Sequence, residues 1–160
     1  MNIRGALPSD ADAIWAILEP IIRAADTYAL PADMRREQAL EYWNSPGNQV
    51  FVAEDQGEVI GTYILRANQR GGGAHVANCG YITAARATGR GIGRAMCEHS
   101  LAQARSQGFK AMQFNFVVSS NERAARLWQS LGFEIVGRLP RAFHHPQKGF
   151  VDALVMYRTL

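Results

Sequence analysis

Apolar residues recur along the chain with two different periods, and the changes of period divide it into helices and strands. Helical spacing predicts a first helix that starts at Ser9 or Asp10 and keeps one apolar face as far as Ala25. Pro20 is expected to bend or interrupt it. Three further helices are expected over residues 33–44, 91–107 and 121–131.

Short apolar or alternating runs between these helices, bounded by Gly, Pro, Asn or Ser, predict strands. They cover residues 3–4, 50–54, 59–66, 74–83, 109–118, 133–137 and 151–157. The segment 138–150 is rich in Pro, His and Phe and is expected to be a loop. The resulting order βααβββαβαββ predicts an α+β fold with a mixed sheet.

Composition and charge narrow the class of protein. The 160 residues are 48% apolar and 19% charged, which suits one globular domain over residues 1–160. A net charge of +3 without a Lys/Arg run argues against nucleic acid, and no apolar run approaches the roughly 20 residues of a membrane helix. Without a secretory signal, metal spacing or a disulfide framework, we expect a cytoplasmic protein with no metal.

The most informative stretch is residues 81–96, in which an apolar strand leads through a glycine-rich loop into a helix. Three glycines occupy alternate positions: Gly89, Gly91 and Gly93. Such a loop places unpaired backbone N–H groups at a helix N-terminus, where they attract a phosphate, and the missing Cβ lets the anion approach. Arg90 and Arg94 add positive charge.

Several interpretations of this loop compete. A nucleoside-triphosphatase loop needs Lys and then Ser or Thr after its last glycine, but Arg94-Ala95 stands there. A dinucleotide loop needs the spacing G-x-G-x-x-G, which is absent. The acyl-coenzyme A loop, Gln/Arg-x-x-Gly-x-Gly/Ala, is matched at every place except Thr88. A glycine-rich turn without any ligand is the remaining interpretation.

A second motif favours the acyl-coenzyme A loop. It reads Asn121-x-x-Ala124-x-x-Leu127-Trp128-x-x-Leu131-Gly132-Phe133. It resembles the Asn-x-x-Ala-x-x-Leu-Tyr-x-x-Leu-Gly-Phe element of the GNAT superfamily of N-acetyltransferases, which also uses this loop and this order of elements. The resemblance covers nearly the whole chain. It implies a three-layer α/β/α fold with four helices and a mixed, mostly antiparallel seven-stranded sheet, acetyl-CoA as cosubstrate and, by analogy, a homodimer.

The resemblance also implies how acetyl-CoA binds. The loop amides hold the pyrophosphate, the end of the preceding strand pairs with the pantetheine where two strands splay apart, and an amide near Ile82 or Thr83 polarises the thioester carbonyl. Asn121 either bonds the pantetheine or caps its helix, and the two roles are compatible. The expected contacts are Tyr81, Ile82, Thr83, Thr88, Gly89, Arg90, Gly91, Ile92, Gly93, Arg94, Asn121 and Trp128.

The catalytic groups depart from the usual family pattern. Trp128 stands where many relatives carry the Tyr that protonates the thiolate, and the strand before the loop has no carboxylate to act as a base. Asn78 and Asn115, with Asn121, resemble the subgroup that includes the fungal azetidine-2-carboxylate (proline-analogue) N-acetyltransferase, in which strand asparagines orient substrate and thioester. We therefore expect Asn78 and Asn115 at the catalytic centre. The other interpretation is that these are internal asparagines whose side-chain amides are hydrogen-bonded to neighbouring backbone groups.

The acceptor pocket is expected between the connector of the first two helices and the loop before the last strand. Its candidate contacts are Tyr28, Leu30 and Phe143. His144 and His145 either relay a proton or are simply exposed. Basic residues that could hold a substrate carboxylate, or merely lie at the surface, are Arg138, Arg141 and Lys148.

The leading hypothesis is an acetyl-CoA-dependent N-acetyltransferase that acts on the amine of a small molecule, an amino acid or an analogue, by direct attack on the thioester. Two alternatives stay open. The acceptor could be a protein or peptide, or the chain could be a non-catalytic acyl-CoA-binding module, for which Trp128 and the missing carboxylate are the best support.

Overall fold

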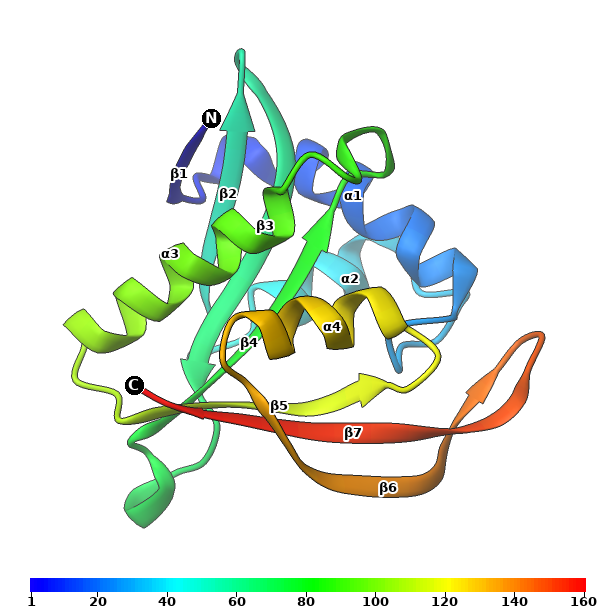
Figure 1. The fold of residues 1–160 in the computed structure, drawn as a ribbon. Helices are drawn as coiled ribbons and strands as arrows, with labels where there is room; N and C mark the ends of the chain where they lie inside the picture. Colours follow the sequence, from blue (N-terminus) through cyan, green and yellow to red (C-terminus); the bar gives the residue numbers. More distant parts are fainter.

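A computed structural model describes all 160 residues. Seven strands form one sheet in the order β1-β2-β3-β4-β5-β7-β6, and only β4 and β5 are parallel (Figure 1). The strands are β1 (Asn2–Gly5), β2 (Gln49–Asp55), β3 (Glu58–Ala67), β4 (Val76–Thr83), β5 (Ala111–Val118), β6 (Glu134–His145) and β7 (Gly149–Thr159). This confirms the predicted α+β fold and its mixed seven-stranded sheet.

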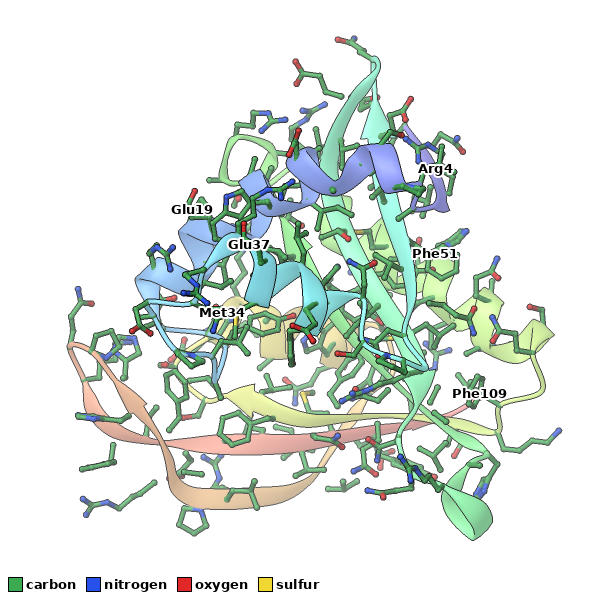
Figure 2. The ribbon with its side chains drawn as sticks, turned by 180° about the vertical axis from the view of Figure 1, so that it is seen from behind. Arg4, Glu19, Met34, Glu37, Phe51 and Phe109 are labelled. Carbon is green, nitrogen blue, oxygen red and sulfur yellow. The ribbon has the colours of Figure 1, made fainter.

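Four α-helices cover the two faces of the sheet. They are α1 (Ala11–Ala24), α2 (Arg36–Trp43), α3 (Ile92–Ser106) and α4 (Glu122–Ser130). Helices α3 and α4 lie in front of the sheet in Figure 1, and α1 and α2 lie in front in the reverse view of Figure 2. The three-layer arrangement follows, with apolar side chains filling both spaces between helices and sheet. None of the helices combines the length and the apolar character that crossing a membrane requires.

Helix α1 differs from the prediction at its start and at its proline. A 3-10 turn over Pro8–Asp10 precedes it, and Asp10 does not cap it, because the carboxylate accepts hydrogen bonds from Arg4 and from the Leu7 amide. The helix continues through Pro20 to Ala24. The proline is exposed, whereas the apolar residues on both sides of it pack on the sheet, so burial of the opposite face outweighs one missing hydrogen bond.

Helix α2 begins at Arg36, later than predicted, because a turn closed by Met34 N and Pro31 O occupies the residues before it. It ends at Trp43, whose fully buried indole donates to Thr62 Oγ1 at 3.0 Å. Gly108 ends α3 with φ +87°, as the sequence predicts.

The prediction of a loop over residues 138–150 is wrong. Strand β6 continues to His145 and forms a long hairpin with β7. Pro140 fits because β6 is the edge strand of the sheet, where one side needs no N–H donor, and because the register shifts between Leu139 and Phe143. Buried His145 closes the hairpin turn by accepting from the amides of Gln147 and Lys148.

Candidate active site

A cavity of about 670 Å³ opens where β4 and β5 separate. The two strands pair only at Val76–Ala111 and Ala77–Met112, and Figure 1 shows them diverging beyond that point. Residues from both sides of the sheet line the cavity, including Tyr28 from the α1–α2 connector and Trp128 from α4. The gap between the strands therefore joins the two faces of the sheet, as the resemblance implied.

The free edge of β4 presents backbone groups to this gap. The amide of Ala84 donates to Ile60 O of β3, and hydrogen bonding alternates along an antiparallel pair, so the amides of Tyr81 and Thr83 face away from β3. The Tyr28 hydroxyl already donates to the Tyr81 carbonyl at 3.2 Å. By the same alternation the amide of Ile82 points toward β3. Of the Ile82 and Thr83 amides, only that of Thr83 faces the gap, while Ile82 contributes a buried side chain to the lining.

The glycine-rich loop ends in a set of backbone N–H groups without partners in the chain. The amide of Arg90 donates to Ala87 O, and the first amide of α3 with an acceptor is that of Ala95. The amides left free belong to Gly89, Gly91, Ile92, Gly93 and Arg94. Gly89 and Gly91 have φ values of +86° and +78°, a backbone conformation that other residues rarely adopt. These free donors stand at the N-terminus of α3, which carries a partial positive charge, and so form an anion site.

Two arginines stand beside these amides. Arg94 lines the cavity and donates to Ser130 Oγ at 2.8 Å. Arg123, in the first turn of α4, also lines the cavity. Its guanidinium lies close to Gly89, with Nη2 3.8 Å from the position that a Cβ would occupy on that glycine. Sequence reasoning missed Arg123, although it lies only two residues after Asn121 in the second motif. The predicted Arg90 lies outside the lining, because its guanidinium pairs with Asp55 at 2.7 Å.

The other predicted contacts of the second motif line the cavity. Asn121 accepts from the amide of Ala124 at 3.4 Å, which confirms its role as a helix cap. The Trp128 ring packs against Tyr81, with centroids 5.0 Å apart. The Tyr81 hydroxyl is bonded to Ser100 on α3, and burial raises its pKa well above its usual range, so the phenol stays protonated.

A chain of polar side chains begins where the gap opens. Arg66 Nε donates to Asn78 Oδ1 at 3.2 Å, and Asn78 Nδ2 donates to the Gln113 carbonyl at 2.9 Å. Gln113 Nε2 donates to Asn115 Oδ1, and Asn115 Nδ2 donates to Asn68 Oδ1. Asn78 is buried and links β4 to β5 just beyond their last backbone pair, so the backbone-bonded interpretation holds for this residue. Asn115 is exposed, bonds only side chains and lines the cavity.

The predicted acceptor contacts divide into two groups. Tyr28 and Leu30 line the cavity, and burial raises the pKa of Tyr28 above its ordinary value. Phe143 does not line it. Phe143 is buried on β6 and packs against Phe116, with ring centroids 6.2 Å apart, and it is Phe116 that faces the cavity. Tyr42 of α2 is a further lining residue that the sequence did not reveal.

The charged residues predicted for the acceptor pocket lie elsewhere on the β6–β7 hairpin. Arg138 pairs with Asp152 at 3.0 Å, Arg141 stacks over Phe150, and none of these residues lines the cavity. His144 stacks on the same phenylalanine and is exposed. The cavity lining instead contains three other arginines, Arg66, Arg94 and Arg123, and no Asp or Glu.

Comparison with known proteins agrees with this geometry. The sequence pattern of the acetyltransferase (GNAT) family matches residues 15–133. A GCN5-related N-acetyltransferase from Kribbella flavida is 42% identical, with a TM-score of 0.94 over 99% of this chain and 97% of that one. A ribosomal-protein-alanine N-acetyltransferase from Brucella melitensis is 26% identical, with a TM-score of 0.87 over the whole of both chains.

A further relative is fungal. The N-acetyltransferase aca1 of Schizosaccharomyces pombe is 26% identical, and the match covers 84% of this chain and 72% of that protein. The family match spans well over half of the chain, and it includes both the loop with free amides and the second motif. The chain therefore belongs to the GNAT family of acetyltransferases and is an enzyme that takes its acetyl group from acetyl-CoA.

Proposed function

We propose that this enzyme acetylates the amine of a small molecule, an amino acid or a close analogue, and that residues 1–160 form one acetyltransferase domain. The observation that carries the proposal is the continuous cavity through the sheet. It joins the free amides at the N-terminus of α3 to an arginine-containing pocket on the α1–α2 face. One molecule of acetyl-CoA and one small acceptor can thus meet in the gap from opposite sides.

The residues of the α3 side fit acetyl-CoA. The five free amides of the loop, with Arg94 and Arg123, supply donors and positive charge for a pyrophosphate. The exposed backbone edge at Tyr81 and Thr83 supplies partners for the amides of a pantetheine arm, in the manner of an added strand. Leu127 and Trp128 give that arm an apolar wall.

Acetyl-CoA supplies a thioester whose carbonyl carbon is attacked by a neutral amine: the new C–N bond replaces the C–S bond, and the proton that the amine loses ends on the departing coenzyme A thiol. In this proposal the backbone amide of Thr83, which faces the gap, stabilises negative charge on the carbonyl oxygen, a type of contact worth roughly 10²–10³-fold in rate elsewhere. Holding both reactants in line can lower the barrier by up to about 7–11 kcal/mol. Positioning therefore carries most of the catalysis proposed here.

The asparagines contribute orientation and not proton transfer, because an amide side chain does not titrate at physiological pH. Asn78 fixes the start of the gap through its bond to β5, and Asn115 presents an amide to the acceptor from the cavity wall. Tyr28, Leu30 and Phe116 enclose the acceptor, and Phe143 supports Phe116 from behind. This enclosure suits a small side chain better than a polymer.

A peptide or protein N-terminus is the second candidate acceptor. The observation in its favour is the full-length similarity to the Brucella melitensis protein, whose name states an acetyltransferase of ribosomal-protein alanine. A peptide N-terminus and a free amino acid share the same α-amine, so the chemistry at the gap would be the same. They differ in the group that follows, which is a peptide bond in one and a carboxylate in the other.

The experiment is an incubation with acetyl-CoA and an amine panel, read out by mass spectrometry of the products. The panel holds the common amino acids, proline analogues, polyamines, aminoglycosides and an alanine-initiated peptide. We expect acetylated amino acids or analogues. Acetylation of the peptide alone would contradict the small-molecule proposal. Asn115→Ala should lower turnover and leave the affinity for acetyl-CoA nearly intact, whereas equal loss of both would contradict the role given to Asn115.

Two further features belong to the proposal. We expect a homodimer, for which the edge strand β6 is the suitable surface because it exposes Ile135, Val136 and Leu139. Light scattering of the purified protein tests the dimer, and a monomer at all concentrations would contradict it.

We also expect a cytoplasmic enzyme, in keeping with its free thiols at Cys79 and Cys97.

A further inference from the structure

Arg66 is the cationic side chain on the acceptor side of the cavity. It lies on β3 directly opposite Asn78 of β4, and both residues line the cavity. Its Nε donates to Asn78 Oδ1, but its two terminal nitrogens donate to no other side chain and form no ion pair. The other two arginines of the cavity stand at the opposite end, beside the loop amides, so Arg66 is a second and separate centre of positive charge.

From this geometry we propose that Arg66 binds a carboxylate of the acceptor, and that the acceptors are amines with a free carboxylate close to the amino group. The proposal rests on the proposed function of this site as a small-molecule N-acetyltransferase. It adds the group of the acceptor that is recognised, its carboxylate, and the residue that selects it.

The orientation of the guanidinium supports this role. Asn78 holds Nε from one side, and Asn78 is itself fixed by its bond to the Gln113 carbonyl. The guanidinium is therefore held in place while both terminal nitrogens remain available, which is the arrangement that accepts a carboxylate through two parallel hydrogen bonds. Arg66 is partly buried, and the cavity that it lines is also lined by Ile64, Tyr28 and other apolar or aromatic residues; such surroundings strengthen the attraction between opposite charges.

The position of Arg66 along the sheet also fits the reaction. Asn78, its neighbour, is the first residue of β4 beyond the last backbone pair with β5. In an α-amino acid only one carbon separates the amine from the carboxylate. A carboxylate on Arg66 therefore keeps the amine beside the opening of the gap, through which the thioester is reached from the other face.

The same charge selects against other amines. Polyamines and aminoglycosides carry several positive charges and no carboxylate, so Arg66 repels them and no Asp or Glu of the cavity lining offsets that repulsion. A peptide N-terminus lacks a carboxylate next to its amine and leaves Arg66 without a partner. Free amino acids and their cyclic analogues satisfy both requirements.

The test compares kcat/KM for the free amino acid with the highest rate in the amine panel and for its carboxamide, in the wild type and in Arg66→Gln. Both compounds offer the same α-amine, and only one is charged at the carboxyl position. We expect the wild type to prefer the free acid by roughly 10- to 100-fold, the usual range for hydrogen bonds between charged groups. Arg66→Gln should lower that preference to within about threefold by losing activity on the free acid alone. Arg66→Lys keeps the positive charge but cannot donate two parallel hydrogen bonds, so its preference for the free acid should lie between those of the wild type and Arg66→Gln.

Each outcome decides the matter. A wild type without preference for the free acid overturns the role of Arg66, as does an Arg66→Gln variant that loses activity on acid and carboxamide equally, because that pattern indicates a structural role. Binding of acetyl-CoA, measured in parallel by calorimetry, shows that the variant is folded. Acetylation of the peptide with none of either small compound would overturn the proposed function together with this inference.

Discussion

Replacing Asn78 with aspartate tests how the gap between β4 and β5 is held open. Asn78 Nδ2 donates to the Gln113 carbonyl at 2.9 Å, and Oδ1 accepts from Arg66 Nε at 3.2 Å. Aspartate has nearly the same shape but no donor at neutral pH. Asn78→Asp therefore keeps the contact with Arg66, but it replaces the donor between the strands with a carboxylate oxygen that lies next to the Gln113 carbonyl oxygen.

The size of the effect follows from these two contacts. Losing the donor leaves a partly buried carbonyl without its partner, which costs about 1–3 kcal/mol. The new ion pair with Arg66 is partly exposed and returns at most about 1 kcal/mol. We expect the free energy of unfolding to fall by about 1–2 kcal/mol and Tm to fall by about 2–8 °C for a chain of this size. The carboxylate also neutralises Arg66, so kcat/KM for a free amino acid should fall about tenfold or more.

The assay is urea unfolding at pH 7, with Asn68→Asp as the matched control. Asn68 belongs to the same polar network but uses only its Oδ1, as acceptor from Asn115 Nδ2, and aspartate keeps an acceptor there. The control should change stability by no more than about 0.5 kcal/mol. Equal destabilisation by both substitutions, or an Asn78→Asp variant as stable as the wild type, would refute the role of the Asn78 donor.

Three further predictions concern the loop, the pH dependence of stability and the thiols. Gly91→Ala and Gly57→Ala both force an alanine into a positive φ (+78° and +82°) where no neighbouring atom is crowded, so each should lower the free energy of unfolding by about 1–2 kcal/mol. Only Gly91→Ala should also weaken the binding of CoA, by about tenfold or more in calorimetry. An unchanged affinity for CoA would contradict the amide site. The hydrogen bonds from Arg4 hold the pKa of Asp10 below its ordinary value, so the stabilisation is full above the unfolded pKa and is lost as pH falls through the folded pKa. Asp10→Asn should therefore destabilise most at pH 7 and progressively less as pH falls below about 4, and an equal loss at every pH would contradict this sign. Burial raises the pKa of Cys79 to about 12, so iodoacetamide at pH 8 should label it only after unfolding, and fast labelling of the folded enzyme would contradict its burial.

Local sequence patterns predicted most of the fold because most elements have one clear period. Helix α3 and the strand before it were placed within two residues at each end, since the loop glycines and Gly108 delimit them. The hairpin over residues 134–159 was predicted poorly, because Pro140 and the neighbouring histidines are typical of a loop. Nothing local reveals that β6 is an edge strand, where a proline and a register shift are tolerated.

The candidate site shows the same division between local and long-range information. The free amides of the loop follow from residues next to one another in sequence, so they were predicted. Arg66 and Arg123 were missed, because their approach to the cavity depends on the pairing of β3 with β4 and on the docking of α4. Arg90 and Phe143 were predicted as contacts but are held elsewhere by Asp55 and by the hairpin.

The measurement that tests the central claim most directly is the rate of thiol release from acetyl-CoA, with a mixture of free amino acids, with a short alanine-initiated peptide and with no amine. If acetyl-CoA and a small acceptor meet in the gap between β4 and β5, release should rise well above the amine-free rate with the amino acids and exceed that with the peptide. Release that rises only with the peptide, or with neither although acetyl-CoA binds, would contradict the account.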